Sequence, residues 1–281
     1  DQTPQRRPTR STGLGMAKSE ASATRGTVLE VGEHVILIDN RQRRYLIQLE
    51  EGGEFHSHAG VIPHDVIIGN SEGSEFRTAS NARFVGLRPT LSDHVLKMPR
   101  GAQVIYPKDL GPIIILTDIS AGARVFESGV GSGALSTALL RAGADVTGYE
   151  IREDFAAKAQ SNVEMFLGAS ALDRYEVKIR DAYEEHEDRD FDRAVLDLPE
   201  PWQVVPHLEK SLRRGGILVV YNPSIIQVQN LRQRLAQGPW AMIETIEVLH
   251  RTWHVEGHSV RPDHRMVAHT GFLTHARLLA V

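Results

Sequence analysis

Short apolar runs separated by turn residues characterise the first third of the chain, between residues 32 and 88. Residues 34–38 read HVILI, residues 45–49 read YLIQL, and the turn-forming sequence DNR lies between them. This pattern predicts two antiparallel strands joined by a tight turn. A further strand is expected near 84–87, with glycines marking the turns before it, so we predict a small β domain. A helical link is expected over about 90–98.

The pattern changes from about residue 123 onward, where apolar runs alternate with helical stretches. Such alternation predicts an α/β domain with a mostly parallel sheet that helices cover on both faces. Strands are expected at 124–126, 145–149, 175–179, 193–196 and 216–221, and helices at 133–141 and 153–166. The last two apolar segments, 243–249 and 270–279, both read as strands. We therefore expect the sheet to end in an antiparallel strand pair.

These changes divide the chain into three predicted parts. Residues 1–28 are rich in Ser, Thr, Arg, Gly and Pro and show no apolar periodicity, so we predict a disordered tail. Residues 29–89 form the predicted small β domain. Residues 90–281 form the α/β domain, and its first part, 90–122, is the helical link.

Composition narrows the class of protein. The 281 residues include no cysteine, which leaves no disulfide framework or thiolate metal site and favours a reducing compartment. We find neither a long apolar run nor a leader sequence, so we expect a cytoplasmic protein that makes no membrane contact. The formal net charge of -4 argues mildly against a nucleic-acid partner. Binding to RNA would therefore have to use local basic patches.

A glycine-rich sequence, ESGVGSG at residues 127–133, lies between a predicted strand and a predicted helix. Such glycines let the chain turn tightly while a ligand approaches its bare backbone. Together with Ala134, the sequence also satisfies the dinucleotide pattern G-x-G-x-x-A, and Glu150 stands where that fold places a ribose-binding acid. The motif by itself therefore leaves a nicotinamide cofactor open.

Four acidic residues distinguish between the possible cofactors. Glu127, Glu150, Asp181 and Asp197 stand at the carboxyl ends of four successive predicted strands, where ligands of open α/β sheets bind. So many carboxylates suit a pyrophosphate poorly, whereas a cofactor with a sulfonium, a free amino group, a ribose and an adenine matches them. The set therefore predicts S-adenosylmethionine as the cofactor.

Several longer motifs are more specific than the glycine loop. They are FHSH at 55–58 with HD at 64–65, MPRGAQVIYPKD at 98–109, DLPEPW at 197–202 and HTGF at 269–272. In these motifs the chain resembles the class I methyltransferases, and more closely the bacterial and archaeal tRNA (adenine-N1)-methyltransferases that modify adenosine 58 of the T-loop. The resemblance runs from about residue 32 to residue 279. It implies a Rossmann-like catalytic domain with an antiparallel C-terminal strand pair, a small N-terminal β domain, a homotetramer and tRNA as the substrate.

The resemblance also implies roles for individual residues. Asp197 matches the catalytic aspartate, which also borders the cofactor. The other implied cofactor-binding residues are Gln103, Tyr106, Glu127, Gly129, Val130, Gly131, Ser132, Gly133, Ala134, Glu150, Ile151, Arg152, Asp181 and Ala182. Two departures are visible: the turn between Arg141 and Asp145 is shorter than in many relatives, and Arg180 precedes Asp181 where the family commonly has glycine.

Candidate contacts to the RNA rest on side-chain chemistry. Aromatic rings can stack on an exposed base, and arginines interleaved with histidines can contact phosphates. The candidates are Trp202, Arg251, His254, Arg261 and His269, with a second basic cluster of Arg41, Arg43 and Arg44. The histidines at 56, 58 and 64 show no metal-binding motif, and methyl transfer to N1 needs no metal, so we expect none.

Three alternative functions stay open at this point. The first is a protein carboxyl methyltransferase of the isoaspartyl type, which has a similar glycine loop. The second is an NAD-dependent dehydrogenase, and the third is a non-catalytic subunit of a methyltransferase. The N-terminal β domain, the DLPEPW motif and the intact cofactor residues favour the tRNA methyltransferase over all three.

Overall fold

The structure, a computed structural model, describes residues 27–280. The predicted tail at 1–28 therefore lies outside the described residues, apart from Thr27 and Val28. Val28 forms an antiparallel bridge with Ser71, and the next residue, Leu29, is fully buried. At this point the chain is already part of the small β domain.

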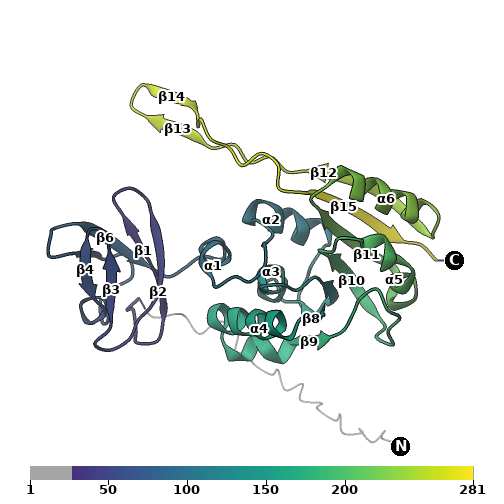
Figure 1. Ribbon diagram of the computed structural model, residues 1–281, viewed down its shortest axis with the longest axis horizontal. Coiled ribbons are helices and arrows are strands. Elements are labelled where there is room, and N and C mark those ends of the chain that lie inside the picture. The colour runs from purple at the N-terminus through teal and green to yellow at the C-terminus, as the bar shows by residue number, and fades with distance from the viewer. Residues whose placement is uncertain (1–26, 281) are drawn as a thin grey trace, which may run out of the picture.

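An antiparallel sheet with the strand order β2-β1-β6-β5 forms the small N-terminal domain (Figure 1). Its elements are β1 (His34–Asp39), β2 (Arg44–Gln48), β5 (Glu75–Arg77) and β6 (Arg83–Leu87), with the hairpin of β3 (Glu54–Ser57) and β4 (Gly60–Pro63) and the 3-10 helix η1 (His64–Val66). In the core of the domain, the ring of Phe55 lies 5.3 Å from that of Tyr45 and 5.6 Å from that of Phe84, between centroids. The strands expected at 34–38, 45–49 and 84–87 are present. The others are only three or four residues long, too short for a clear alternation of polar and apolar positions.

Two helices, α1 (Leu91–Lys97) and α2 (Pro107–Leu116), join this domain to the larger one. Thr90 begins α1 with a capping box, in which the Thr90 hydroxyl accepts a hydrogen bond from the Asp93 N–H and the Asp93 carboxylate accepts one from the Thr90 N–H. Asp93 also forms an ion pair with Arg44 of β2, at 2.5 Å. One carboxylate thus caps the linking helix and anchors the β domain to it.

A seven-stranded mixed sheet with the order β12-β15-β11-β10-β7-β8-β9 forms the larger domain. Its strands are β7 (Arg124–Ser128), β8 (Asp145–Glu150), β9 (Tyr175–Ile179), β10 (Phe191–Leu196), β11 (Leu212–Asn222), β12 (Trp240–Glu247) and β15 (Phe272–Leu278). The strands from β7 to β11 pair in parallel, whereas β15 runs antiparallel between β11 and β12. The α/β fold with an antiparallel C-terminal strand pair is therefore confirmed.

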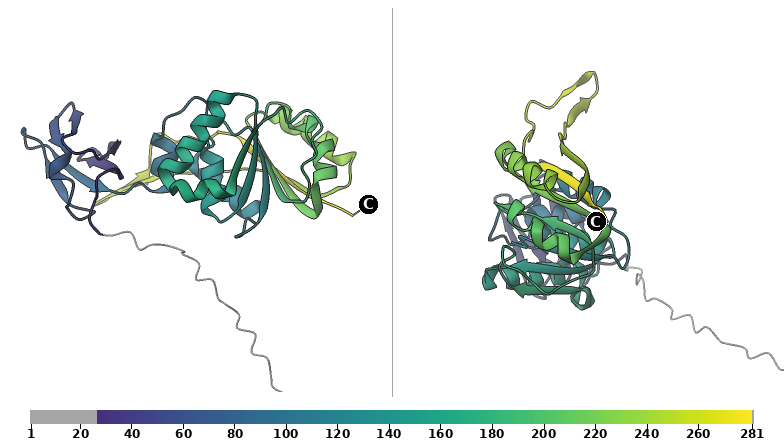
Figure 2. Two further views of the ribbon diagram at one scale, coloured as in Figure 1. Left: turned by 90° about the horizontal axis from the view of Figure 1, so that it is seen from below. Right: turned by 90° about the vertical axis from the view of Figure 1, so that its right-hand side faces the viewer.

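Helices cover both faces of this sheet (Figure 2). On one face α2 packs beside α3 (Ala134–Arg141) and α4 (Glu153–Leu167), and on the other lie α5 (Val205–Ser211) and α6 (Ile225–Ala236). The 3-10 helices η2 (Ala169–Arg174) and η3 (Pro201–Gln203) precede β9 and α5. Each face of the sheet has its own hydrophobic core. Val125 of β7 packs into the core beneath α2, α3 and α4, and the next residue, Phe126, packs into the core beneath α5 and α6. None of the helices in residues 27–280 is long and apolar enough to cross a lipid bilayer.

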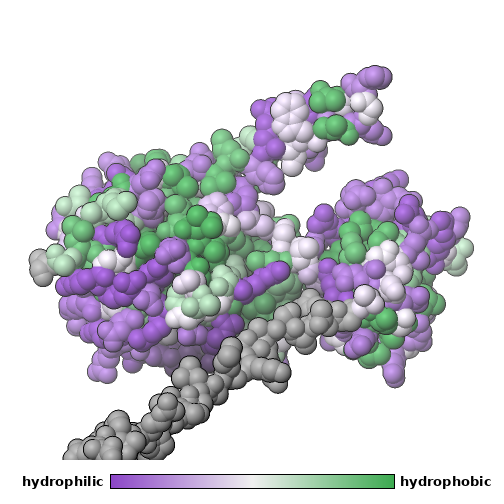
Figure 3. Space-filling view, turned by 180° about the vertical axis from the view of Figure 1, so that it is seen from behind, coloured by the Kyte–Doolittle hydropathy of each residue, from purple (hydrophilic) through white to green (hydrophobic). Residues whose placement is uncertain are grey.

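A projecting hairpin, made by β13 (Trp253–Glu256) and β14 (Ser259–Pro262), emerges between β12 and β15 (Figure 1). We call residues 248–271 the arm. Cross-strand partners Val255 and Val260 share one face of the hairpin with Trp253, whereas His254 and Arg261 share the other. Trp253, Val255 and Val260 are 58%, 70% and 60% exposed, and Figure 3 shows the arm standing clear of the body. The sequence did not predict this hairpin.

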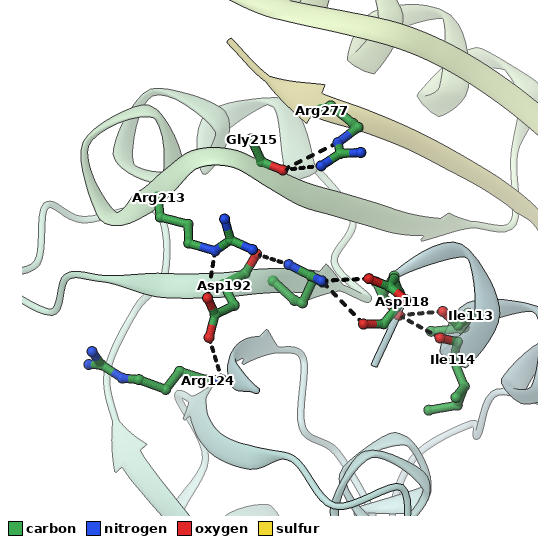
Figure 4. A network of polar contacts seen from close by, with 10 residues as sticks. Ile113, Ile114, Asp118, Arg124, Asp192, Arg213, Gly215 and Arg277 are labelled. Carbon is green, nitrogen blue, oxygen red and sulfur yellow. Dashed lines mark hydrogen bonds and ion pairs between the residues drawn. The ribbon is translucent and has the colours of Figure 1, made fainter. Parts of the chain in front are cut away.

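Ion pairs and hydrogen bonds join the strands at the amino-terminal edge of the sheet (Figure 4). Asp192 of β10 accepts a hydrogen bond from the Arg213 side chain at 2.5 Å and one from the Arg124 N–H at 3.0 Å. The buried Arg193 pairs with Asp118 at 2.8 Å. These contacts tie β7, β10 and β11 together at the end of the sheet opposite to the four predicted acids.

Candidate active site

The four predicted acids lie at one edge of the sheet, because β10, β7, β8 and β9 are neighbours in that order and run parallel. Glu127 belongs to β7 and Glu150 ends β8, while Asp181 and Asp197 follow β9 and β10. Two of the other carboxylates act on Glu127, since Asp197 and Glu150 both raise its pKa. The structure therefore brings together the residues that the sequence placed at successive strand ends.

The glycine loop between β7 and α3 needs its glycines for two separate reasons. Gly129, Gly131 and Gly133 have φ angles of 85°, 54° and 81°, in the left-handed region that residues with a Cβ rarely adopt. At Gly129 a Cβ would also lie 2.0 Å from the Asp197 carbonyl oxygen. The Asp197 N–H donates to the Ser128 carbonyl at 2.9 Å, so the two loops are in direct backbone contact. A glycine at 129 is thus a condition for the position of Asp197.

Glu150 orients the glycine loop through its carboxylate. One oxygen accepts from the Gly131 N–H at 3.0 Å and the other from the Arg152 N–H at 3.1 Å. Each oxygen keeps a second lone pair for a further donor such as a hydroxyl group. The next residue, Ile151, is exposed, and the Arg152 side chain pairs with Asp154 at 2.7 Å.

Glu127 is fully buried and only partly hydrogen-bonded. One carboxylate oxygen accepts from the Ser136 hydroxyl at 2.7 Å, and the Tyr175 hydroxyl donates to Ser136 at 2.8 Å. The other oxygen has no hydrogen-bond partner among the described residues. Burial, opposed by the Ser136 hydrogen bond, raises the pKa of Glu127 to about 8.

Asp197 is a second acid with a raised pKa at this edge. It keeps partial exposure to solvent, but the protein packed around its carboxyl raises its pKa to about 7 by desolvation. Two carboxyls that are costly to ionise, one of them without its full set of hydrogen bonds, favour a ligand that brings positive charge and N–H donors. A sulfonium cofactor with a free amino group fits both requirements.

The segment before α2 lies against the glycine loop. The N–H groups of Gly101 and Ala102 donate to the Ser132 hydroxyl at 3.1 and 3.3 Å. Asn162 of α4 donates to the carbonyls of Pro99 and Ser132, at 2.9 Å each. These bonds hold the 99–102 stretch beside the loop, next to the predicted cofactor residues Gln103, which is exposed, and Tyr106, which is the N-cap of α2.

Asp181 is exposed and lies at the start of the loop that follows β9. Its carboxylate accepts from the Tyr183 N–H at 2.9 Å, while Ala182 between them is buried. Val130 is also buried and packs against β8, where a Cβ on Gly148 would lie 2.7 Å from its Cγ2. Ala182 and Val130, two apolar residues of the predicted cofactor set, are thus buried next to the loops that carry the polar ones.

The candidate RNA contacts are spread over two regions. Trp202 lies in η3, five residues after Asp197, and is partly buried. Arg251, His254 and Arg261 lie on the arm, away from the sheet edge that carries the four acids. His269 is held between Glu247 at 2.7 Å and the Pro223 carbonyl at 2.8 Å, and the hydrogen bond to Glu247 raises its pKa.

The predicted basic cluster at 41–44 is largely neutralised. Arg43 pairs with Asp39 at 2.7 Å, and Arg44 pairs with Asp93. The histidines of the same domain do not meet at one point: His64 is buried and accepts from the Glu50 N–H, whereas His56 pairs with Glu54. Within residues 27–280, no cluster of three or more potential ligands is arranged to hold a metal.

Four residues of the site were not found from the sequence. Ser136 holds Glu127 and is itself held by Tyr175, Asn162 holds the 99–102 stretch, and the Tyr183 N–H donates to Asp181. Asn162 gave the one usable signal, because a polar residue between Ala159 and Val163 on the buried side of a helix needs hydrogen-bond partners. The others have side chains that are common in ordinary cores.

Comparisons with known proteins agree with this geometry. Residues 84–262 match the family described as the tRNA methyltransferase complex GCD14 subunit, and residues 28–75 match the TrmI-like N-terminal family. The tRNA (adenine(58)-N(1))-methyltransferase TrmI of Thermus thermophilus is 35% identical over 246 residues, which cover 86% of this chain and 96% of the relative. The tRNA (adenine(57)-N(1)/adenine(58)-N(1))-methyltransferase TrmI of Methanocaldococcus jannaschii is 33% identical over 270 residues, covering 86% and 94%.

Solved structures show the same fold over nearly the whole chain. The tRNA (m1A58) methyltransferase TrmI of Aquifex aeolicus superposes with a TM-score of 0.80 at 29% identity, covering 90% of this chain and 100% of that one. A protein of Thermotoga maritima described as a SAM-dependent O-methyltransferase gives a TM-score of 0.86 at 32% identity, covering 91% and 96%. With both of its domains matched, the chain belongs to the tRNA methyltransferase family of the GCD14 subunit and TrmI.

Proposed function

We propose that this protein transfers the methyl group of S-adenosylmethionine to N1 of adenosine 58 in the T-loop of tRNA. Membership of the family supports the reaction class, and relatives named for this reaction match over 86% of the chain. Within the site, the proposal rests on the pair of desolvated carboxyls, Glu127 and Asp197, on either side of the glycine loop. A cationic cofactor and a base that becomes cationic on methylation would offset the cost of ionising both carboxyls.

The cofactor supplies an electrophilic methyl group on a sulfonium. We assign its ribose to Glu150, whose carboxylate is already oriented by two backbone N–H groups. We assign its adenine to Asp181 and its amino group to Glu127, whose free oxygen lacks a donor among the described residues. The 103–106 segment then covers the methionine end.

Asp197 is the residue to which we assign the catalytic function. Adenine N1 already carries a lone pair, so the protein has only to hold N1 in line with the methyl group at a short distance. The base becomes positively charged as the new bond forms. In its ionised form the Asp197 carboxylate accepts a hydrogen bond from the exocyclic amino group and stabilises that charge. Contact with Gly129 and Ser128 fixes the backbone from which this carboxylate extends.

The target base has to leave its stack before N1 can reach the site. Trp202 is partly buried and lies in η3, on the loop that begins with Asp197. We assign this ring as a stacking surface for the extruded adenine, a contact of about 1–3 kcal/mol per base in single-strand binders.

The arm supports the proposal of a homotetramer. Isolated two-stranded hairpins are marginally stable in water, and this one exposes Trp253, Val255 and Val260 on a single face. We assign that face to contacts between copies of the chain, and the opposite face with His254 and Arg261 to tRNA. Replacing both Trp253 and Val255 with serine should lower the particle mass measured by light scattering, whereas Glu256→Ala on the polar face should leave it unchanged. An unchanged mass for the double variant would place the interface elsewhere.

The direct test incubates the protein with labelled S-adenosylmethionine and an unmodified tRNA transcript, followed by digestion and mass spectrometry of the nucleosides. We expect 1-methyladenosine, lost when adenosine 58 is replaced and strongly reduced with Asp197→Ala. Transfer to isoaspartyl peptides but not to tRNA would replace the proposed substrate with a protein. Binding of NAD in place of S-adenosylmethionine would refute the methyltransferase assignment altogether.

A further inference from the structure

Tyr183 connects three elements around the site. Its N–H donates to the Asp181 carboxylate at 2.9 Å, and its carbonyl contacts His207 Nε2 of α5 at 2.9 Å. Its phenol oxygen accepts a hydrogen bond from the Glu200 N–H at 3.1 Å. A single partly buried side chain therefore joins the loop after β9 to the loop after β10.

The two loops that Tyr183 joins have different proposed ligands. Asp181, at the start of the first loop, is assigned to the adenine of the cofactor. The second loop, residues 197–202, carries Asp197 and Trp202, both assigned to the target base. Tyr183 thus lies between the cofactor side and the RNA side of the site.

Other bonds also hold the 197–202 loop. At its first residue, the Asp197 N–H donates to the Ser128 carbonyl beside the glycine loop at 2.9 Å. Asn222 of β11 donates to the Leu198 carbonyl at 3.4 Å, and Gln227 of α6 donates to the Pro199 carbonyl at 2.9 Å. Neither of these side chains touches a residue assigned to the cofactor adenine. Among the described contacts, the Tyr183 hydroxyl links Glu200, two residues before Trp202, to the loop that carries Asp181.

We propose that Tyr183 is a positioning residue through which the bound cofactor and the tRNA strengthen each other's binding. A ligand that bonds to Asp181 restrains the turn from Asp181 to Tyr183, and with it the ring whose oxygen holds the Glu200 N–H. The 197–202 loop then needs less ordering when the target base enters. By linkage, the tRNA strengthens cofactor binding by the same factor. This inference rests on the proposed function.

The test measures tRNA affinity with and without the reaction product S-adenosylhomocysteine, which occupies the cofactor site without turnover. For the unaltered protein, we expect the unmodified tRNA transcript to bind about tenfold tighter with the product present, within the usual range of coupling between sites. Tyr183→Phe keeps the ring and removes the acceptor for the Glu200 N–H. We expect its ratio to fall below threefold, with S-adenosylhomocysteine affinity in the absence of tRNA nearly unchanged.

Tyr45→Phe, in the core of the β domain, is the matched control because it removes a phenol far from the site, and it should keep the full ratio. A ratio near one in the unaltered protein, or the full ratio in Tyr183→Phe, would overturn the proposal and leave the methyltransferase function standing. Loss of S-adenosylhomocysteine binding in Tyr183→Phe would also overturn it, because Tyr183 would then be part of the cofactor pocket. Failure of the unaltered protein to bind either ligand would instead count against the proposed function.

Discussion

Gly129→Ala tests the contact between the glycine loop and the 197–202 loop, which carries the proposed catalytic residue Asp197. An alanine Cβ at this position would lie 2.0 Å from the Asp197 carbonyl oxygen. Because carbon and oxygen atoms rarely approach closer than about 3.3 Å, one of the two backbones has to move by about 1.3 Å. The φ angle of 85° adds about 1–2 kcal/mol of strain for a residue with a Cβ. A displacement of about 1 Å in a catalytic group can lower the rate about 100-fold.

Gly122→Ala separates strain from displacement. Gly122 precedes β7 and Gly129 follows it, and the two have similar φ angles, 78° and 85°. A Cβ on Gly122 has no atom within 4 Å, so this variant carries the strain without the clash. We expect both variants to lose stability in thermal unfolding, by about 2–4 °C per kcal/mol.

Only Gly129→Ala should lose methyl transfer, about 100-fold in single-turnover experiments with saturating cofactor and tRNA, performed below both melting temperatures. Full activity of Gly129→Ala would refute the reasoning, because the 197–202 loop would then tolerate a shift of more than 1 Å. A similar loss of activity in Gly122→Ala would do so as well, since strain alone would explain the result.

Three further predictions follow from buried charges. Desolvation raises the pKa of Asp197 to about 7, so kcat/KM should rise with pH through about 7 as the carboxylate forms. Asp197→Asn should give a low kcat/KM that does not change with pH. An unchanged rise in this variant would assign the titration to another group. The pKa of Glu127 is raised to about 8, so between pH 4.5 and 8 the folded protein keeps a proton that the unfolded chain has released. The free energy of unfolding therefore decreases as the pH rises from about 4.5 to about 8. Glu127→Gln should therefore melt higher than the cofactor-free parent at pH 8.5 and about equally at pH 5, whereas a difference independent of pH would contradict this. Asp118→Asn should cost less than about 1 kcal/mol in chemical denaturation, because Asp118 is 77% exposed and Arg193 keeps its hydrogen bonds to the carbonyls of Asp118 and Asp192. A loss of about 2 kcal/mol or more would show that this ion pair is what holds the edge.

The central strands and the four acids could be predicted because they depend on local sequence. Strands buried on both faces read as continuous apolar runs, and an acid at the end of each run lies at the ligand-binding edge whatever the details of packing. The hairpin of the arm is harder to predict: Trp253, Val255 and Val260 alternate with polar residues on either side of Gly257, but each strand is only four residues long and belongs to no core cluster of the chain. Helix α6 was overlooked, although Ser224 and Gln227 form a capping box that the sequence displays.

The hydrogen-bond partners within the site were harder to foresee. Tyr175 and Ser136 are 39 positions apart, and Asn162 and Ser132 are 30 apart. Whether two such side chains meet depends on how α3, α4 and β9 pack, which no local pattern encodes. The roles of the arm residues Arg251, His254 and Arg261 stay predictions for the same reason, since they concern contacts beyond a single chain.

The position of β15 has a consequence for how the protein is made. This strand follows all the others in the chain, yet it lies between β11 and β12, and β12 pairs with no other strand of the sheet. Until residues 272–278 have been synthesised, β11 keeps an open edge and β12 has no neighbour to pair with. An exposed edge of apolar strand attracts other chains, so the growing polypeptide is prone to aggregate until these residues have been made. Truncation within β15 should therefore reduce the yield of folded protein far more than the loss of a few residues suggests.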